Sequence, residues 1–255
     1  MAKVVEQAKI LQNSEIADGI FDMHLLTKKI AHQARCGQFV HIDCGGDTFL
    51  RRPISVCDTD GDVLRILYQV KGKGTAELAK YQKDDVIDVL GPLGNWFTVK
   101  KENALLIGGG IGTYPLLKLA RDLENPTALL GFRNKSLVTL EEDFRAACND
   151  TRIVTDDGSF GEKGLVTDFM GQIIEDKQIK IIYACGPKVM LKAVCRMAAE
   201  YGVKIQVSLE ERMGCGIGAC LVCSCKIKQK KGDGWEYRQV CKNGPIFWGD
   251  EVIFE

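Results

Sequence analysis

The chain has 255 residues, and its 45% hydrophobic and 27% charged composition is ordinary for a globular protein with a sizeable core. Its 34 basic and 34 acidic side chains balance, which argues against nucleic acid or a membrane surface as a partner. The N-terminus carries charges throughout and no apolar stretch approaches the roughly 18 residues of a membrane span, so we expect a cytoplasmic protein. In that compartment thiols stay reduced, so the 11 cysteines are not expected to form disulfides.

Short segments of alternating apolar and polar residues fill the first hundred positions, among them QFVHIDC, RRPISV and VLRILYQV. Gly, Asp and Asn separate these segments, which predicts an antiparallel β-barrel or sandwich. We expect one short helix in this region, TAELAKYQ, directly after a GKG sequence.

The hydrophobic period changes near residue 103. There NALLIGGGIG predicts a buried strand that ends in a glycine turn, and TYPLLKLARDLE predicts a helix. Strand and helix patterns then alternate as far as Glu210, which predicts an open, mostly parallel sheet wrapped by helices. Beyond Glu210 a cysteine-rich segment begins. We therefore expect a β-barrel domain at 1–100, an α/β nucleotide-binding domain at 101–209, and a small C-terminal module at 210–255.

Three loops of the α/β domain, GGGIG, TDDGSFG and YACGP, each follow a predicted strand. Glycines between a strand and a helix let a phosphate approach the backbone amides. The first loop departs from G-x-G-x-x-G because Thr113 replaces the last glycine, so a purely structural turn remains an alternative for that motif. Three loops that meet at the carboxyl edge of the sheet favour a nucleotide crevice. Its expected binding residues are Gly109, Gly110, Gly112, Cys185 and Gly186.

The barrel segment carries two motifs that suit an anion. RRPIS places Arg52 three residues before Ser55 on a predicted strand, and GKGT opens the short helix with free amides and a hydroxyl. An exposed arginine on a strand is commonly just solvated, but an arginine beside a helix N-terminus is suited to clamp a pyrophosphate.

The sequence MGCGIGACLVCSC at 213–225 contains four cysteines. Cys215, Cys220 and Cys223 follow C-x4-C-x2-C, the plant-type [2Fe–2S] spacing, and Cys241 supplies the distant fourth cysteine. Zinc is the alternative, but it commonly uses two C-x2-C pairs, and this chain has one such pair and no histidine after residue 41. We expect Cys225 to be a small buried hydrophobe and not the fourth ligand.

The order of these motifs resembles the ferredoxin–NADP reductase superfamily, in which the barrel binds FAD and the α/β domain binds a nicotinamide nucleotide. The resemblance implies that Arg52 pairs with the FAD pyrophosphate and that Ser55 lies near the flavin ring. This chain has Ile54 where many members have tyrosine. The FAD-binding residues that the resemblance implies are Arg52, Pro53, Ile54, Ser55, Leu67, Tyr68, Gln69, Gly74 and Thr75.

Because a cysteine module follows this core in the sequence, the whole chain is similar to the electron-transfer subunits of bacterial dihydroorotate dehydrogenase B. That resemblance implies an oxidoreductase subunit with FAD, a [2Fe–2S] cluster and NAD as cofactors. It also implies a partner, an FMN-containing catalytic subunit, in a heterotetramer with two copies of each chain. Electrons would pass from dihydroorotate to FMN, then through the cluster and FAD of this chain to NAD⁺, in pyrimidine (UMP) biosynthesis.

Two questions stay open at this stage. No acidic residue caps TALLGF and Arg133 would suit a 2′-phosphate, so NAD in preference to NADP follows from the resemblance alone. Alternative functions are a reductase that serves a ferredoxin or an oxygenase, one half of a bifurcating complex, and, outside enzymes, a zinc-stabilised binding module. No residue of this chain suggests a dihydroorotate site, so we expect no catalytic residue for that step.

Overall fold

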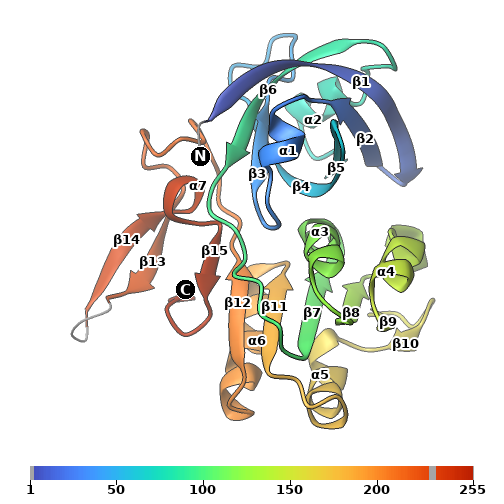
Figure 1. Cartoon of the computed structure of the whole chain (residues 1–255), viewed down its shortest axis with the longest axis vertical. Helices are drawn as coiled ribbons and strands as arrows, with labels where there is room; N and C mark the ends of the chain where they lie inside the picture. The colour runs from blue at the N-terminus through green and yellow to red at the C-terminus, as the bar shows by residue number, and fades with distance from the viewer. Residues whose placement is uncertain (1–2, 230–233, 255) are drawn as a thin grey trace.

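The computed structural model describes residues 3–229 and 234–254. Figure 1 shows a β-barrel at the top, a sheet with helices below it, and the C-terminal module beside both. The expected fold class, a barrel followed by a parallel α/β domain and a small C-terminal module, is confirmed.

Six antiparallel strands close the barrel in the order β1-β2-β5-β4-β3-β6. They are β1 (Val4–Ala17), β2 (Ile20–Leu26), β3 (Phe39–Ile42), β4 (Arg52–Asp60), β5 (Val63–Gln69) and β6 (Val86–Leu93). Alternate residues of β5, namely Leu64, Ile66 and Tyr68, belong to the hydrophobic cluster inside the barrel, as the period of two predicts. The expected short helix is α2 (Lys73–Leu78), while a second short helix, α1 (Ile30–Gln33), was not expected.

The second unit is a seven-stranded sheet of order β10-β9-β8-β7-β11-β12-β15. Its parallel strands are β7 (Ala104–Gly109), β8 (Thr127–Phe132), β9 (Asp150–Thr155), β10 (Glu162–Lys163), β11 (Ile181–Cys185) and β12 (Lys204–Ser208). Every residue of β7 and β11 is buried, as expected for strands covered on both faces. Helices α3 (Tyr114–Asp122) and α4 (Glu141–Ala147) pack on one face, and α5 (Val166–Asp176) and α6 (Lys188–Glu200) pack on the other. Two single-turn 3₁₀ segments, η1 (Gly110–Thr113) and η2 (Lys135–Leu137), follow β7 and β8.

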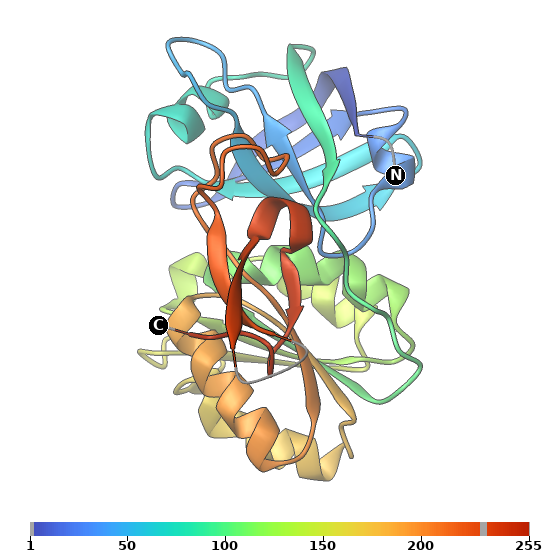
Figure 2. The same ribbon diagram turned by 90° about the vertical axis from the view of Figure 1, so that its left-hand side faces the viewer.

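The C-terminal module contains the hairpin of β13 (Ser224–Lys228) and β14 (Trp235–Gln239), then α7 (Val240–Asn243) and β15 (Ile246–Trp248). Strand β15 leaves the module and pairs antiparallel with β12 at the edge of the α/β sheet. Figure 2 shows the module in front, across the junction between barrel and sheet. The module is therefore tied into the sheet, which the sequence pattern did not indicate.

Apolar packing and charges join the barrel to the α/β domain. Ile20, Cys57 and Leu67 of the barrel belong to the same buried cluster as the apolar face of α3. In a neighbouring ion network, Arg65 of β5 pairs with Asp22 of β2 at 2.8 Å and with Asp143 of α4 at 2.9 Å. One buried apolar cluster and one network of ion pairs therefore span the two domains. Within residues 3–229 and 234–254, no helix has the length and apolarity that a bilayer crossing needs.

Candidate cofactor and metal sites

Arg52, at the start of β4, lies against the first turn of α2. Its guanidinium is so close to Gly74 that a Cβ on that glycine would collide with it. Thr75 closes the turn, because its Oγ1 accepts hydrogen bonds from the amides of Lys71 at 2.9 Å and Gly72 at 3.2 Å. The remaining amides of the first helical turn have no partner within the helix. The expected pairing of an arginine with a helix N-terminus is thus present in the fold.

The neighbouring Arg51 has a different role from Arg52. Its Nη1 lies 2.6 Å from Oδ1 of Asp88 and donates to the carbonyl of His41 at 3.3 Å, so it ties β3 to β6. Among the residues that the structure describes, Arg52 has no acidic partner. Of the two adjacent arginines, only Arg52 keeps its charge free for an anionic ligand.

The other residues expected at the flavin site fall into two groups. Pro53, Ile54 and Ser55 are half-buried on β4 and pair with β3. On β5, by contrast, Leu67 is buried against the α/β domain and Gln69 is half-buried.

Tyr68 lies inside the barrel, with 2% of its surface exposed. Its hydroxyl donates to Oδ1 of Asn13 at 2.9 Å, and its ring stacks on Phe21 with centroids 5.5 Å apart. The Tyr68 side chain is therefore engaged in the barrel core, and its place at the flavin site stays a prediction.

A groove of about 690 Å³ lies between the start of β4 and the cysteine segment. On the barrel side it is lined by residues 47–53 and Lys73, and on the module side by residues 211–214 and Val222. Arg52 and the loop that holds Cys215 and Cys220 thus border one space. The sequence predicted a flavin site at Arg52 and a cluster site at the cysteines, but not that the two regions lie side by side.

The nucleotide loops meet at the carboxyl edge of the sheet. A Cβ on Gly112 would lie 2.5 Å from the carbonyl oxygen of Cys185 and 2.6 Å from the Cα of Gly186, so the first and third loops are in direct contact. Gly109 packs on Met190 of α6. Gly110 differs, because it has φ +54° and a Cβ there would meet open space. Among the three expected glycines of this loop, Gly110 therefore has open space beside its main chain.

The loop after β9 joins the same edge from the other side. Oγ of Ser159 accepts a hydrogen bond from the amide of Lys135, in the loop after β8, at 2.7 Å. Oδ1 of Asp157 accepts from the amide of Ser159 at 2.9 Å and so holds the TDDGS turn. Arg133, which would suit a 2′-phosphate, is exposed in the loop after β8.

The four cysteines expected as ligands lie in one region of the module as two pairs. The Cys215 thiolate accepts from the amides of Ala219 at 3.2 Å and Cys220 at 3.4 Å, and its side chain also hydrogen-bonds with Cys220. Burial raises the pKa of Cys215, but these hydrogen bonds outweigh burial and lower it to about 6. The amide of Cys241 donates to Sγ of Cys223 at 3.4 Å, the two thiols face each other, and both residues are buried.

This paired arrangement fits a binuclear cluster, in which each of two irons takes two protein thiolates. Within the described part of the chain, no three His, Cys, Asp or Glu side chains converge as a single ion would require. Cys225 faces elsewhere, because its thiol donates to the carbonyl of Arg238 at 3.4 Å, and burial raises its pKa to about 11. The donor set, thiolates with amides aimed at sulfur, suits iron and sulfide.

Two residues near these sites were not singled out from the sequence. His41 of β3 is 1% exposed, and a Cβ on Gly216 of the cysteine loop would lie 2.6 Å from its Nδ1. Burial lowers the pKa of His41 to about 4, with Arg51 acting in the same direction, so the ring is neutral at pH 7. Glu210 follows β12 at the carboxyl edge of the sheet; it is open to solvent, yet desolvation by its surroundings raises its pKa while Lys71 opposes this. The charge of Lys71, which directly precedes the GKGT sequence, therefore acts on the end of β12.

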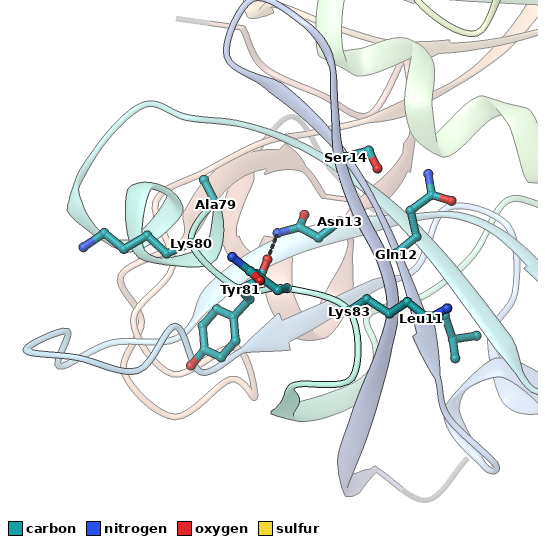
Figure 3. Close-up of a pocket in the computed structure, with 9 residues that line it drawn as sticks. Leu11, Gln12, Asn13, Ser14, Ala79, Lys80, Tyr81 and Lys83 are labelled. Carbon is teal, nitrogen blue, oxygen red and sulfur yellow. Dashed lines mark hydrogen bonds between the residues drawn. The ribbon is translucent and has the colours of Figure 1, made fainter.

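A second hollow, of about 610 Å³, lies on the barrel between β1 and the segment after α2 (Figure 3). Nδ2 of Asn13 donates to the carbonyls of Leu78 at 3.0 Å and Tyr81 at 2.8 Å. These bonds hold the end of α2 against β1. The hydrogen bonds of Asn13 therefore support α2, the helix against which Arg52 packs.

Comparison with known proteins agrees with this geometry. The family model for the iron–sulfur cluster binding domain of dihydroorotate dehydrogenase B matches residues 210–253. A solved NADH-dependent reduced ferredoxin–NADP oxidoreductase, a protein of flavin-based electron bifurcation, has a TM-score of 0.87 and 33% identity, with 98% of this chain and 90% of that chain covered. The ferredoxin reductase of carbazole 1,9a-dioxygenase (TM-score 0.67, 18% identity, 80% of this chain and 67% of that chain) shares the fold. The chain is thus a flavin reductase-type oxidoreductase with an iron–sulfur module.

Relatives of known name give the narrower assignment. The electron transfer subunit of dihydroorotate dehydrogenase B (NAD(+)) from Caldanaerobacter subterraneus subsp. tengcongensis is 40% identical over 249 residues, which cover 97% of this chain and 98% of that protein. The same subunit from Bacillus caldolyticus is 40% identical over 262 residues, with the same shares covered. The chain belongs to this family of electron transfer subunits.

Proposed function

We propose that this chain passes electrons between a partner's dihydroorotate-oxidising site and NAD⁺ through a [2Fe–2S] cluster and FAD. The observation that carries the proposal is the single groove bordered by Arg52 and by the cysteine loop. When bound, a flavin exchanges a hydride with nicotinamide and single electrons with an iron–sulfur cluster. The chain provides neighbouring binding sites for the flavin and the cluster and so holds them close to each other.

The proposed binding residues follow from the contacts above. Arg52, with the first-turn amides of α2, holds the pyrophosphate of FAD, and β4 beyond it borders the flavin. Gly110 and the loops after β9 and β11 receive the nucleotide. Cys215 and Cys220 hold one iron of the cluster, and Cys223 and Cys241 hold the other. The three units at 1–100, 101–209 and 210–255 thus each carry one cofactor.

We propose an FMN-containing catalytic subunit as the partner, two of each chain forming a heterotetramer. Its docking on the cysteine loop is supported by exposed apolar side chains beside the ligands: Leu221 is 65% and Val222 is 58% exposed. Leu221 also has φ +63°, an unusual conformation for leucine. Because none of the eleven cysteines forms a disulfide, we place the assembly in the cytoplasm, where thiols remain reduced.

The test uses the purified chain alone and with its partner. The absorption spectrum should contain both flavin and [2Fe–2S] bands, and the chain alone should oxidise NADH with an artificial acceptor. It should not oxidise dihydroorotate until the catalytic subunit is added. Dihydroorotate turnover by the chain alone would contradict this division of labour, and a colourless protein that contains zinc would contradict the whole proposal.

The second candidate is one part of an electron-bifurcating oxidoreductase, which the likeness to the solved bifurcating enzyme favours. The partner distinguishes the two functions. Capture of the tagged chain from its native cells should recover a dihydroorotate-oxidising subunit. Recovery of a ferredoxin-reducing flavoprotein in its place would establish the second candidate.

A further inference from the structure

His41 lies between the two sites that the proposed function joins. Its strand, β3, runs antiparallel to β4, and His41 is the register partner of Pro53, next to Arg52. Its ring faces the cysteine loop at Gly216. His41 thus contacts the cysteine loop through its side chain. Through its strand it pairs with Pro53, the residue that follows Arg52.

The ring of His41 is buried and makes no hydrogen bond of normal geometry. It is 1% exposed, and neither Nδ1 nor Nε2 has a partner at full hydrogen-bond geometry, although the main chains of Arg51 and Cys215 lie beside the ring. Polar groups at this depth normally have one, because an unpaired buried donor or acceptor destabilises the folded state. A leucine would fill similar space without that penalty, so the imidazole nitrogens need another explanation than packing.

The cysteine loop contacts the ring of His41 at Gly216. Gly216 has φ +68°, and a Cβ there would also clash with Nδ1 and Cε1 of His41. The main chain of Cys215 lies beside the ring. The polar atoms that His41 can reach in this loop therefore belong to the main chain next to a cluster ligand.

We propose, on the basis of the proposed function, that His41 is a positioning residue that holds the [2Fe–2S] loop against the flavin-binding strands through a hydrogen bond from its ring to the loop main chain at residues 215 and 216. Such a contact fixes the Cys215 ligand relative to β4. Removal of a residue that hydrogen-bonds to a metal ligand or to its main chain commonly lowers metal affinity by about 10-fold or more.

The experiment compares His41→Asn with His41→Leu in the full chain loaded with FAD and cluster. Asparagine places an amide near the position of Nδ1, whereas leucine has a similar size and no donor. The leucine variant should keep its FAD, show an altered EPR signal of the reduced cluster, and lose the cluster to an iron chelator about 10-fold faster. The asparagine variant should resemble the wild type in both measurements.

Equal behaviour of the two variants, whether both native or both damaged, would overturn the proposal, because the hydrogen bond would then make no difference. Should leucine prevent folding, Gly216→Ala tests the same contact from the buried glycine of the cysteine loop and should also alter the EPR signal; an unchanged signal would overturn the contact. A wild-type chain without flavin and cluster bands would instead overturn the proposed function, which is a separate result.

Discussion

The nucleotide crevice and the cysteine loop are both glycine-rich, yet they are held in place by different means. The crevice loops extend from fully buried parallel strands, and Gly112 packs directly on the main chain of Cys185. Between β12 and β13, by contrast, the cysteine loop contains no helix or strand, and its amides point at the sulfur of Cys215. The first site is thus built by the fold itself, whereas the second is completed only by what its thiolates bind.

The largest effect is expected at the cysteine loop. Cys241→Ser should abolish the [2Fe–2S] absorption and EPR signal, because Cys241 is paired with Cys223 at the proposed second iron. Cys225→Ser is the matched control and should leave both signals in place, since that thiol is bonded to the carbonyl of Arg238. The opposite result for the two variants would show that the fourth ligand is wrongly assigned.

A similar pair of variants tests the barrel. Arg52→Ala should weaken FAD binding by about 30- to 100-fold, the effect of one charge-assisted hydrogen bond of about 2–3 kcal/mol, while the cluster stays bound. Arg51→Ala removes the bond to Asp88 and should lower the melting temperature with a much smaller loss of FAD. Flavin content after desalting measures the first effect. Full flavin retention in Arg52→Ala would contradict the assignment.

The junction of barrel and sheet should respond to pH. Burial raises the pKa of Asp22, but hydrogen bonds from His24 and Arg65 outweigh it and hold the pKa below the usual range of an aspartate. A lowered carboxyl pKa stabilises the fold above the unfolded-state value of about 3.9, and this stability is lost as the pH falls through the folded-state pKa. Asp22→Asn should therefore cost about 3 kcal/mol at pH 7 and flatten the acid limb of the stability curve.

Urea unfolding between pH 2 and 7 measures this effect. The exposed pair of Lys9 and Asp84 supplies the control, because Asp84→Asn should change stability little and only at low salt. If the two variants had the same pH profile, the domain junction would not depend on Asp22.

The smallest effect is expected at the crevice, which the fold already supports. Gly110→Ala places a methyl group in the open space of the proposed phosphate site and should raise the KM for NADH about 10-fold, which corresponds to about 1.4 kcal/mol. Gly112→Ala collides with Cys185 and should instead destabilise the α/β domain. An unchanged KM in Gly110→Ala would place the phosphate elsewhere.

The sequence predicted what depends on local patterns. The change in hydrophobic period distinguished the barrel from the parallel sheet, and the cysteine spacing grouped the four candidate ligands. Tyr68 illustrates what a motif leaves open, because the resemblance implies a residue at the flavin site, while only the alternation of β5 shows that its side chain lies inside the barrel. The contact of His41 with Gly216 joins residues that are far apart in the chain, so no local pattern contains it. The four-residue helix α1 is too short for a periodic signal.

Strand β15 has a consequence for how the protein is made. It covers the edge of β12, yet it is synthesised about 40 residues later, after the whole cysteine loop. The α/β domain therefore carries an uncovered sheet edge until β15 has left the ribosome and paired with β12. An uncovered edge favours association between chains. Because Cys241 precedes β15 in the chain, this edge is covered only after the last candidate cluster ligand has also been made.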